Sequence, residues 1–192
     1  MCGRYYIDSD VEKEIFRIVQ EIDENMKMGR AGDIYPSQEA PVLYGKGERL
    51  RGGGMRWGFQ GRDNRLLINA RAETVMERPT FSDSVRQRRC VIPAKHFYEW
   101  NREKQKVTFG SGQKRTLFMA GFYREQEDGP HFIILTTAAN DSVRPVHERM
   151  PLILGKEEIR SWIWEDSRLC GFLNKSSPLL ERWQDYEQIR MF

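Results

Sequence analysis

The chain opens with Met1-Cys2-Gly3-Arg4, so removal of Met1 would leave Cys2 with a free α-amine beside its thiol. Such a 1,2-aminothiol condenses with an aldehyde, because the amine forms an imine and the neighbouring thiol then closes a thiazolidine ring. The reference pKa is roughly 7.7–8.0 for an α-amine and about 8.5 for a cysteine thiol. Each group therefore has an accessible reactive form near neutral pH, and the fold must expose the terminus and place proton-transfer groups beside it. The alternative is that Cys2 simply follows the initiator methionine.

Four further segments carry polar or charged side chains within otherwise core-like sequence: residues 69–73, 97–100, 136–140 and 147–151. Asn69 and Arg71 follow an apolar run and alternate to one side of an expected strand end. Glu99 stands between aromatic residues, where partial desolvation would raise its pKa toward the range useful for proton transfer. His147 and Arg149 place an imidazole and a guanidinium just before another strand. Each has a structural explanation of its own, but their occurrence together with Cys2 predicts chemistry.

Composition predicts a single soluble α+β domain spanning residues 1–192. At 39% hydrophobic and 31% charged residues, the chain is long enough to bury a core. It contains no run of about 18 apolar residues, and its first twenty residues include Arg4, Lys13, Arg17 and several acids. Secretion and membrane spanning are therefore not expected, and we expect a cytoplasmic protein. The cysteines at 2, 90 and 170 and the histidines at 96, 131 and 147 lack disulfide or metal-ligand spacing. We therefore expect no metal and no cofactor, with Cys90 and Cys170 as small buried hydrophobes.

Charge is distributed unevenly along the chain. Residues 1–48 hold six Lys and Arg against ten Asp and Glu, whereas residues 49–89 hold ten Arg against four acids. Arginine suits bidentate contact with phosphate better than lysine does. The basic stretch is therefore either a surface for a phosphate-bearing partner or an ordinary solvated face.

The expected elements are one long helix followed by short strands. A capping-box pattern at Ser9-Asp10-Val11-Glu12 and an apolar stripe predict a helix over 10–28, ended by Gly29. Short apolar runs predict strands at 40–44, 55–59, 66–70, 90–93, 117–123, 132–137 and 152–154, and short helices are expected at 81–89, 157–164 and 167–173. Because most strands are joined without regular helices, we predict a mixed, largely antiparallel sheet or partly open β-barrel with peripheral helices.

The chain resembles the SOS-response-associated peptidase family, the abasic-site-processing proteins, over essentially its whole length. The resemblance rests on seven motifs in order: Met1-Cys2-Gly3-Arg4-Tyr5, Tyr35-Pro36-Ser37-Gln38, Met55-Arg56-Trp57-Gly58, Asn69-Ala70-Arg71-Ala72-Glu73, Arg89-Cys90-Val91-Ile92-Pro93-Ala94, Phe97-Tyr98-Glu99-Trp100 and His147-Glu148-Arg149-Met150-Pro151. One such motif would be weak, but seven in sequence with the cysteine at position 2 are specific.

The resemblance implies covalent capture of abasic sites in single-stranded DNA, with the ring-opened sugar aldehyde bonded to Cys2. His147 would open the closed sugar, Glu99 would move protons during imine formation, and Asn69 would hold the amine or a phosphate. Loss of a proton from the imine would give a weak lyase activity. The peptidase label implies hydrolytic exposure of Cys2 rather than digestion of other proteins.

The resemblance implies two kinds of DNA contact: arginines that bind phosphates and an aromatic side chain that stacks on bases. The phosphate-binding residues would be Arg4, Arg71 and Arg149; Arg56 is a weaker candidate. Trp57, assisted by Pro36, would hold neighbouring bases apart; the alternative for Trp57 is core packing under a Gly58 turn.

One departure from the family pattern concerns residue 96, where the family usually has glycine and this chain has histidine. If the position requires a positive φ, histidine is costly there, and the loop that carries Glu99 would be placed differently.

Two other classes fit part of the pattern. Glutamine amidotransferases of the N-terminal-nucleophile type also begin Met-Cys-Gly, but the glutamine-binding segments expected of them are not visible and the basic stretch would be unexplained. A noncatalytic module for single-stranded or modified DNA would need the arginines and aromatics but not Cys2, Glu99 or His147.

Overall fold

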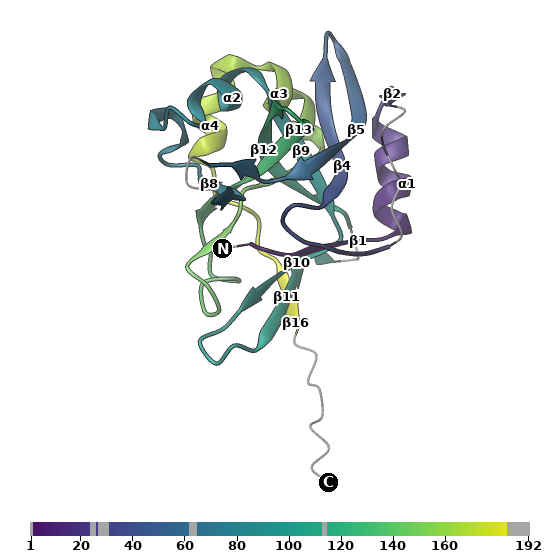
Figure 1. Ribbon diagram of the computed structural model, residues 1–192. Helices are drawn as coiled ribbons and strands as arrows, with labels where there is room; N and C mark the ends of the chain where they lie inside the picture. Colours follow the sequence, from purple (N-terminus) through teal and green to yellow (C-terminus); the bar gives the residue numbers. More distant parts are fainter. Residues whose placement is uncertain (1, 24–25, 27–30, 62–64, 113–114, 184–192) are drawn as a thin grey trace.

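Two β-sheets share one hydrophobic core in the computed structural model, which describes residues 2–23, 26, 31–61, 65–112 and 115–183 (Figure 1). The smaller sheet is antiparallel, in the order β16 (Glu181–Trp183), β11 (Lys106–Gly110), β10 (His96–Trp100), β1 (Tyr5–Ile7) and β3 (Gly32–Ile34). The larger sheet has the order β14 (Arg149–Pro151), β13 (Gly129–Ala138), β12 (Leu117–Gln126), β9 (Arg89–Ala94), β4 (Glu39–Lys46), β5 (Arg49–Trp57) and β2 (Glu21–Ile22). Strand β15 (Ile153–Leu154) pairs with β12, β8 (Asn69–Arg71) pairs with β13, and β6 (Phe59–Gln60) pairs with β7 (Leu66–Leu67).

A further pairing closes part of the larger sheet into a barrel. Strand β13 pairs in parallel with β5, where Phe132 lies opposite Trp57, so β13, β12, β9, β4 and β5 form a hydrogen-bonded ring. The other pairings around this ring are antiparallel. The α+β class and the largely antiparallel, barrel-like sheet predicted from the sequence are confirmed. All the strands predicted from apolar runs are present, although several have different ends.

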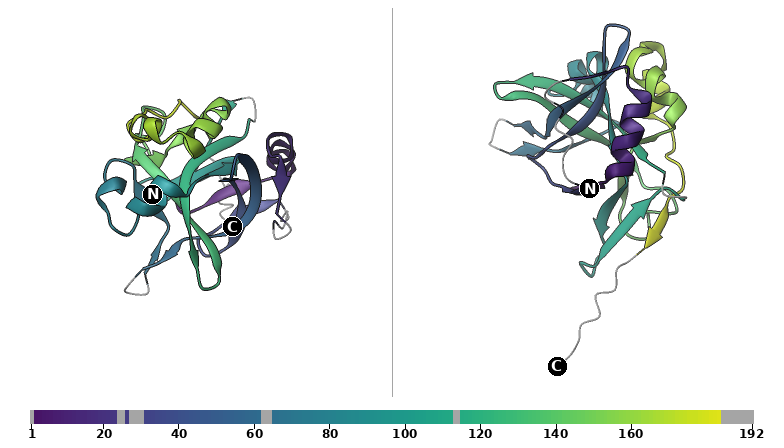
Figure 2. Two further views of the ribbon diagram at one scale, coloured as in Figure 1. Left: turned by 90° about the horizontal axis from the view of Figure 1, so that it is seen from above. Right: turned by 90° about the vertical axis from the view of Figure 1, so that its right-hand side faces the viewer.

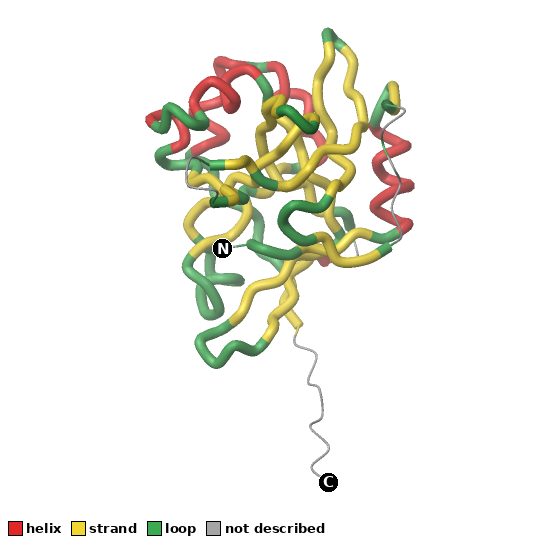
Figure 3. The backbone as a smooth tube through the Cα atoms, viewed as in Figure 1, coloured by secondary structure: helices red, strands yellow, loops and turns green. Residues whose placement is uncertain are grey.

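The helices lie at the periphery of the strands (Figure 3). The α-helices are α1 (Ser9–Ile18), α2 (Ser82–Gln87), α3 (Ile159–Trp164) and α4 (Leu169–Leu173), with 3-10 turns η1 (Val75–Glu77), η3 (Lys156–Glu158) and η4 (Asp166–Arg168). Helix α1 runs along the outside of the strands (Figure 2), and its Glu14 side chain pairs with Lys156 of η3. No helix in the described part of the chain is long and apolar enough to cross a membrane.

Helix α1 is shorter than the sequence predicted. Its N-cap is Asp8, whose carboxylate accepts from the N–H groups of Asp10 and Val11, and it ends at Ile18 with an extended Val19. The expected helix to residue 28 is wrong, because residues 21–22 form β2 and pair with β5. Met26 lies against Gly52 of β5, so sheet contacts use the apolar residues that continued the helical spacing. The expected stop at Gly29 lies outside the described residues.

Three non-local pairings bring the motifs together. Strand β1 lies beside β10, so the start of the chain runs alongside Glu99. Strand β8 adds to β13 with Asn69 opposite Ile134, and β14, which follows His147, adds to the same strand. The segment 136–140 supplies this junction: Thr136 is buried with its hydroxyl directed at the carbonyl of Ala70. The junction of β1, β8, β10 and β14 is therefore where the polar motifs meet.

Candidate functional site

Cys2 is completely buried at this junction. Its carbonyl accepts a hydrogen bond from Asn69 Nδ2 at 2.9 Å, and its Sγ lies 3.8 Å from the carbonyl oxygen of Arg4. Burial and then the negative charge of Glu99 raise the pKa of the Cys2 thiol far above its ordinary value. The exposed, readily ionised thiol expected from the sequence is therefore wrong for this conformation, in which the thiol is neutral at neutral pH.

Glu99 is the buried carboxylate of the site, with 3% of its surface exposed. It lies on β10 between Tyr98 and Trp100, and strand alternation turns it toward the interior while Trp100 is exposed. Burial raises the pKa of Glu99, and the nearby His147 imidazole opposes the rise. A carboxyl with a raised pKa can take up and release protons closer to neutral pH than an ordinary glutamate does.

His147 connects this carboxylate with the surface. Its Nε2 lies 3.9 Å from Glu99 Oε2, and its side chain is 28% exposed. Its Nδ1 lies 3.0 Å from the backbone nitrogen of Arg149, which donates to it, so that contact orients the ring with Nε2 toward Glu99. The pair therefore places one titratable group in the interior next to another that reaches the surface.

Asn69 and Arg71 diverge in environment although both lie on β8. The Oδ1 of Asn69 is buried and has no hydrogen-bond partner among the described residues, while its Nδ2 is used by Cys2. A buried acceptor without a donor costs free energy, on the order of 1–3 kcal/mol. Arg71 is exposed, and no ion pair involves it in the described part of the chain. Asn69 thus offers a vacant acceptor near Cys2, and Arg71 offers an uncompensated cation nearby.

Arg4 is held by a carboxylate. Its Nη2 donates to Oδ2 of Asp33, and its guanidinium lies over the rings of Tyr35 and Tyr98, 4.9 and 5.0 Å from their centroids. No sequence motif indicated Asp33, which meets Arg4 because β1 pairs with β3. Although partial burial of Asp33 acts in the opposite direction, hydrogen bonds from Arg4 and Tyr98 lower the pKa of its carboxyl.

Arg149 is likewise paired. Its two terminal nitrogens donate to the carboxylate oxygens of Glu73 at 2.7 and 2.8 Å, and Nη2 also donates to the carbonyl of Thr136 at 2.6 Å. The hydrogen bond from Arg149 lowers the pKa of Glu73, with burial acting against it. The sequence placed Glu73 in a motif without assigning it a partner.

Trp57 belongs to the core, and its proposed role as a wedge between bases is wrong for this conformation. It has no exposed surface, donates from Nε1 to the carbonyl of Ile68 at 3.0 Å and stacks on Phe132 at a centroid distance of 6.2 Å. Gly58 follows with a φ of 113°, which turns the chain after the barrel closure. The alternative of core packing under a Gly58 turn accounts for Trp57.

Exposed aromatic surface near the site comes instead from Tyr35 and Trp100, which are 42% and 39% exposed. Pro36 is half-buried, and Ser37 beside it has a φ of 72° and donates its N–H to the Trp57 carbonyl. The loop that presents Tyr35 is therefore fixed by backbone contacts. Both aromatics stand within quoted motifs, but only the fold distinguishes them from the buried Trp57.

Trp57→Ala is expected to lower the free energy of unfolding by about 3–5 kcal/mol, because it removes a fully buried indole at the barrel closure. Urea unfolding measures this change, and Trp100→Ala is the matched control because that indole is exposed. A Trp57→Ala protein with unaltered stability and impaired DNA binding would instead support a role for Trp57 as a wedge between bases.

Much of the basic stretch 49–89 is structural. Arg49 pairs with Glu21, and Arg51 pairs with Glu21 and Asp23. The Arg89 guanidinium is buried, donates to Ile163 O and pairs with Asp166. Arg56 pairs with Asp128. These arginines therefore offer no extended phosphate surface, and Arg71 remains as the exposed member of the stretch at the site.

His96 does not distort the segment that carries Glu99. It lies on β10, and positive φ among the described non-glycine residues is confined to Ser37 and Lys104. Its ring stacks on Tyr6 at 4.8 Å, and its Nε2 lies 2.9 Å from the hydroxyl of Tyr98. His96 therefore does not displace the strand that carries Glu99.

The two other cysteines differ in exposure. Cys90 is buried, as the sequence predicted, whereas Cys170 is exposed, so the prediction that it is buried is wrong.

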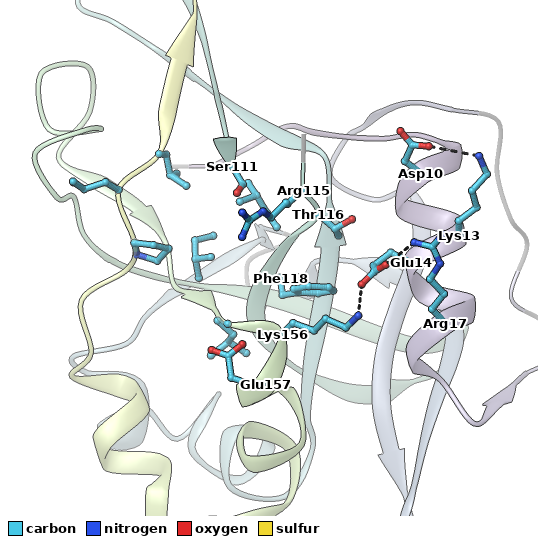
Figure 4. Close-up of a pocket in the computed structure, with 17 residues that line it drawn as sticks. Asp10, Lys13, Glu14, Arg17, Ser111, Arg115, Thr116, Phe118, Lys156 and Glu157 are labelled. Carbon is cyan, nitrogen blue, oxygen red and sulfur yellow. Dashed lines mark hydrogen bonds and ion pairs between the residues drawn. The ribbon is translucent and has the colours of Figure 1, made fainter. Parts of the chain in front are cut away.

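A cavity of about 790 Å³ lies away from Cys2 and opens between α1 and the segments 153–157 and 178–180 (Figure 4). Glu14 there binds Lys156 at 2.6 Å and Arg17 at 3.4 Å, so its charges largely compensate one another. Among the described residues no group of His, Cys, Asp and Glu is arranged to hold a metal ion.

Comparison with known proteins gives consistent matches. The sequence model of the SOS response associated peptidase (SRAP) family matches residues 1–186. The chain is 34% identical over 180 residues to the abasic site processing protein YoqW of Bacillus subtilis (strain 168), covering 85% of this chain and 80% of YoqW. It is 26% identical over 180 residues to the abasic site processing protein YedK of Escherichia coli (strain K12), covering 86% and 81%. The crystal structure of a phage-related protein from Bordetella bronchiseptica has the same fold, with a TM-score of 0.79 at 20% identity over 97% of this chain and 95% of that one.

Proposed function

Because this chain belongs to the SOS response associated peptidase (SRAP) family, we propose that it captures abasic sites in single-stranded DNA through a thiazolidine formed by Cys2. Relatives that match most of the chain are named abasic site processing proteins. The observation that carries the proposal is the convergence of Asn69, Glu99 and His147 around a cysteine at position 2.

The burial of the thiol favours an order of events in which the amine reacts first. Once Met1 is removed, the α-amine of Cys2 adds to the sugar aldehyde, and loss of one water gives a protonated imine. The neutral thiol then adds to the imine carbon, its proton passes to the Glu99 carboxylate, and the C=N electron pair returns to nitrogen. The net change is one new C–N bond, one new C–S bond and one water released.

Asn69 and His147 support the steps before ring closure. The vacant Oδ1 of Asn69 is suited to accept a hydrogen bond from the α-amine or a sugar hydroxyl. His147, half-buried and oriented by Arg149, would shuttle the proton that opens the closed sugar. If the imine instead loses a proton from the carbon beside it, the 3′ phosphate is eliminated, which is a lyase side reaction.

DNA would be held by a small set of cations and aromatics. Arg71 supplies the uncompensated charge, and Arg4 and Arg149 supply guanidiniums that are already oriented by carboxylates. Tyr35 and Trp100, with Pro36, provide exposed surface for bases; a base stacked on an aromatic ring contributes roughly 1–3 kcal/mol. Capture in single strands avoids the cost of opening a duplex.

We propose that residues 1–192 act as one domain in the cytoplasm and that this domain lies at the nucleoid when it is bound to DNA. Peptidase activity would consist of hydrolytic exposure of Cys2, for which ordinary methionine removal suffices. The reaction requires no metal and no cofactor, since amine, thiol and proton carriers come from the chain itself.

Intact mass spectrometry tests this function in one experiment. The purified protein should lack Met1, and mixing with single-stranded DNA that carries one abasic site should give a species at the sum of both masses minus one water. An undamaged strand of the same sequence is the control. Retention of Met1, or reversible binding without any adduct, would favour a noncatalytic DNA-binding module or amide hydrolysis instead.

His147→Gln is expected to slow adduct formation and strand cleavage together, by about 10²-fold or more, because both need the open sugar. Gel assays of both products over time measure this effect. Equal rates for wild type and His147→Gln would remove His147 from the mechanism.

A further inference from the structure

We propose that Asp33 limits the reversible affinity of the site for DNA: its fixed carboxylate neutralises Arg4 and so weakens the grip on single-stranded DNA, whether intact or abasic. This inference rests on the proposed function, which makes Arg4 a phosphate contact. It concerns a residue that belongs to none of the sequence motifs that define the site.

Asp33 is anchored at both carboxylate oxygens. Oδ2 accepts from Arg4, and Oδ1 accepts from the Tyr98 hydroxyl at 2.9 Å. Because the Tyr98 proton is donated to Asp33, the Tyr98 oxygen accepts from His96 Nε2 at 2.9 Å. His96 is itself stacked on Tyr6. The chain His96–Tyr98–Asp33 therefore holds the carboxylate in place, so that displacing it breaks these hydrogen bonds.

Arg4 has supports that do not depend on the charge of Asp33. Its guanidinium lies over the rings of both Tyr35 and Tyr98, and both contacts are within cation–π distance. Its Nε is buried and lacks a hydrogen-bond partner among the described residues, so Asp33 does not satisfy all its donors. The aromatic pair therefore positions Arg4, whereas Asp33 sets its net charge.

Glu73 provides a contrast. It binds Arg149 through two parallel hydrogen bonds, and Arg149 has no aromatic support of this kind among the described ring contacts. Glu73 therefore both neutralises and positions its arginine. Of these two paired arginines, Arg4 is the one whose partner can lose its negative charge while other contacts keep the guanidinium in position, which makes Asp33 the informative residue.

The carboxylate affects undamaged DNA and abasic DNA alike, because phosphate contacts carry no information about the base. A phosphate that binds Arg4 must displace Asp33 or lie beside it, and both cost free energy. Intact strands then dissociate quickly, while a strand with an abasic site is retained by the covalent bond. Retention of a strand is thus decided by covalent capture and not by reversible affinity.

The test measures reversible binding in a Cys2→Ala background by fluorescence anisotropy with undamaged single-stranded DNA. Asp33→Asn, which keeps the shape of the side chain, should bind about three- to tenfold more tightly. The slope of log K against log salt should steepen by up to about 0.7, the value for one additional phosphate on a single strand. Asp10→Asn is the matched control, since it makes the same charge change at an exposed site on α1.

Arg4 supplies the second arm of a double-mutant cycle. In an Arg4→Ala background, Asp33→Asn should give a clearly smaller gain, because there is no guanidinium to release and only the repulsion between the carboxylate and a phosphate is removed. Unchanged or weaker binding by Asp33→Asn, or an equal gain without Arg4, would overturn the proposal. If Asp33→Asn does not fold, Asp33→Ser makes the same charge change and is judged by the same outcomes.

Covalent capture separates this inference from the proposed function. With Cys2 intact, Asp33→Asn should raise the capture rate at low DNA concentration but leave the rate at saturating DNA unchanged, because the chemistry at Cys2 is not altered. Failure of the wild type to form an adduct would refute the proposed function. A wild-type adduct with no affinity gain in Asp33→Asn would refute only the role of Asp33.

Discussion

Cys2→Ala is expected to abolish every denaturant-resistant complex with abasic single-stranded DNA. The substitution removes the thiol that closes the ring and leaves an amine whose imine hydrolyses back. Reversible binding should persist within about twofold, because Arg4, Arg71 and Arg149 are unchanged and phosphate contacts dominate affinity. Denaturing gels measure the adduct, and anisotropy under native conditions measures the binding.

The matched control is Cys170→Ala, which removes an exposed cysteine instead of a buried one. Thiol reactivity in general follows exposure and thiolate character, so a nonspecific adduct would form at Cys170 rather than at Cys2. Loss of the adduct in Cys170→Ala, with retention of the adduct in Cys2→Ala, would show that the reactive cysteine is Cys170 and would contradict the role of Cys2. Borohydride reduction provides a further distinction: it should trap the residual imine in Cys2→Ala, since the amine remains.

The sequence predicted the barrel better than the smaller sheet, for physical reasons. Strands such as β9 and β12 carry continuous apolar runs because they lie within the barrel, and such runs are visible locally. Strands β1, β3, β11 and β16 are short and were not predicted; three of them, β1, β3 and β16, have three residues each. Helix α1 was extended too far because Ile22 and Met26 continue its spacing, whereas the pairing of Ile22 with β5 and the contact of Met26 with Gly52 are non-local.

The candidate site was accessible to sequence reasoning only as separate residues. Motifs named Asn69, Glu99 and His147, and the fold places them around Cys2. Sequence motifs do not show which side chain pairs with each charged residue. Asp33 meets Arg4 through strand pairing and Glu73 meets Arg149 across two segments, so arginines that looked available for phosphate are already paired. Burial likewise decided between two roles for Trp57.

Glu99→Gln is expected to slow adduct formation by about 10²- to 10⁴-fold, the range that general acid–base catalysis contributes. Glutamine keeps the size of the side chain but cannot accept a proton from the Cys2 thiol during ring closure. Since the Glu99 carboxyl is buried and its pKa is raised, a neutral amide should not destabilise the fold. Thermal unfolding checks that point, and single-turnover kinetics with abasic DNA measure the rate.

The pH dependence of the capture rate tests the role of Glu99 more directly than the rate at one pH. Glu99 accepts a proton only when ionised, so the wild-type capture rate should fall as the pH drops through the pKa of Glu99. Burial raises that pKa and His147 opposes the rise, so the fall should lie above the pH at which an ordinary glutamate titrates. Glu99→Gln should lack this acidic limb while keeping the decline that comes from protonation of the α-amine.

Glu103→Gln is the matched control, because Glu103 is exposed in the turn after β10 and makes the same change of charge. It should leave both the rate and the acidic limb intact. A Glu99→Gln protein that captures abasic DNA at the wild-type rate would show that the proton goes elsewhere. The His147 imidazole, 3.9 Å from Glu99 and partly exposed, would then be the candidate acceptor.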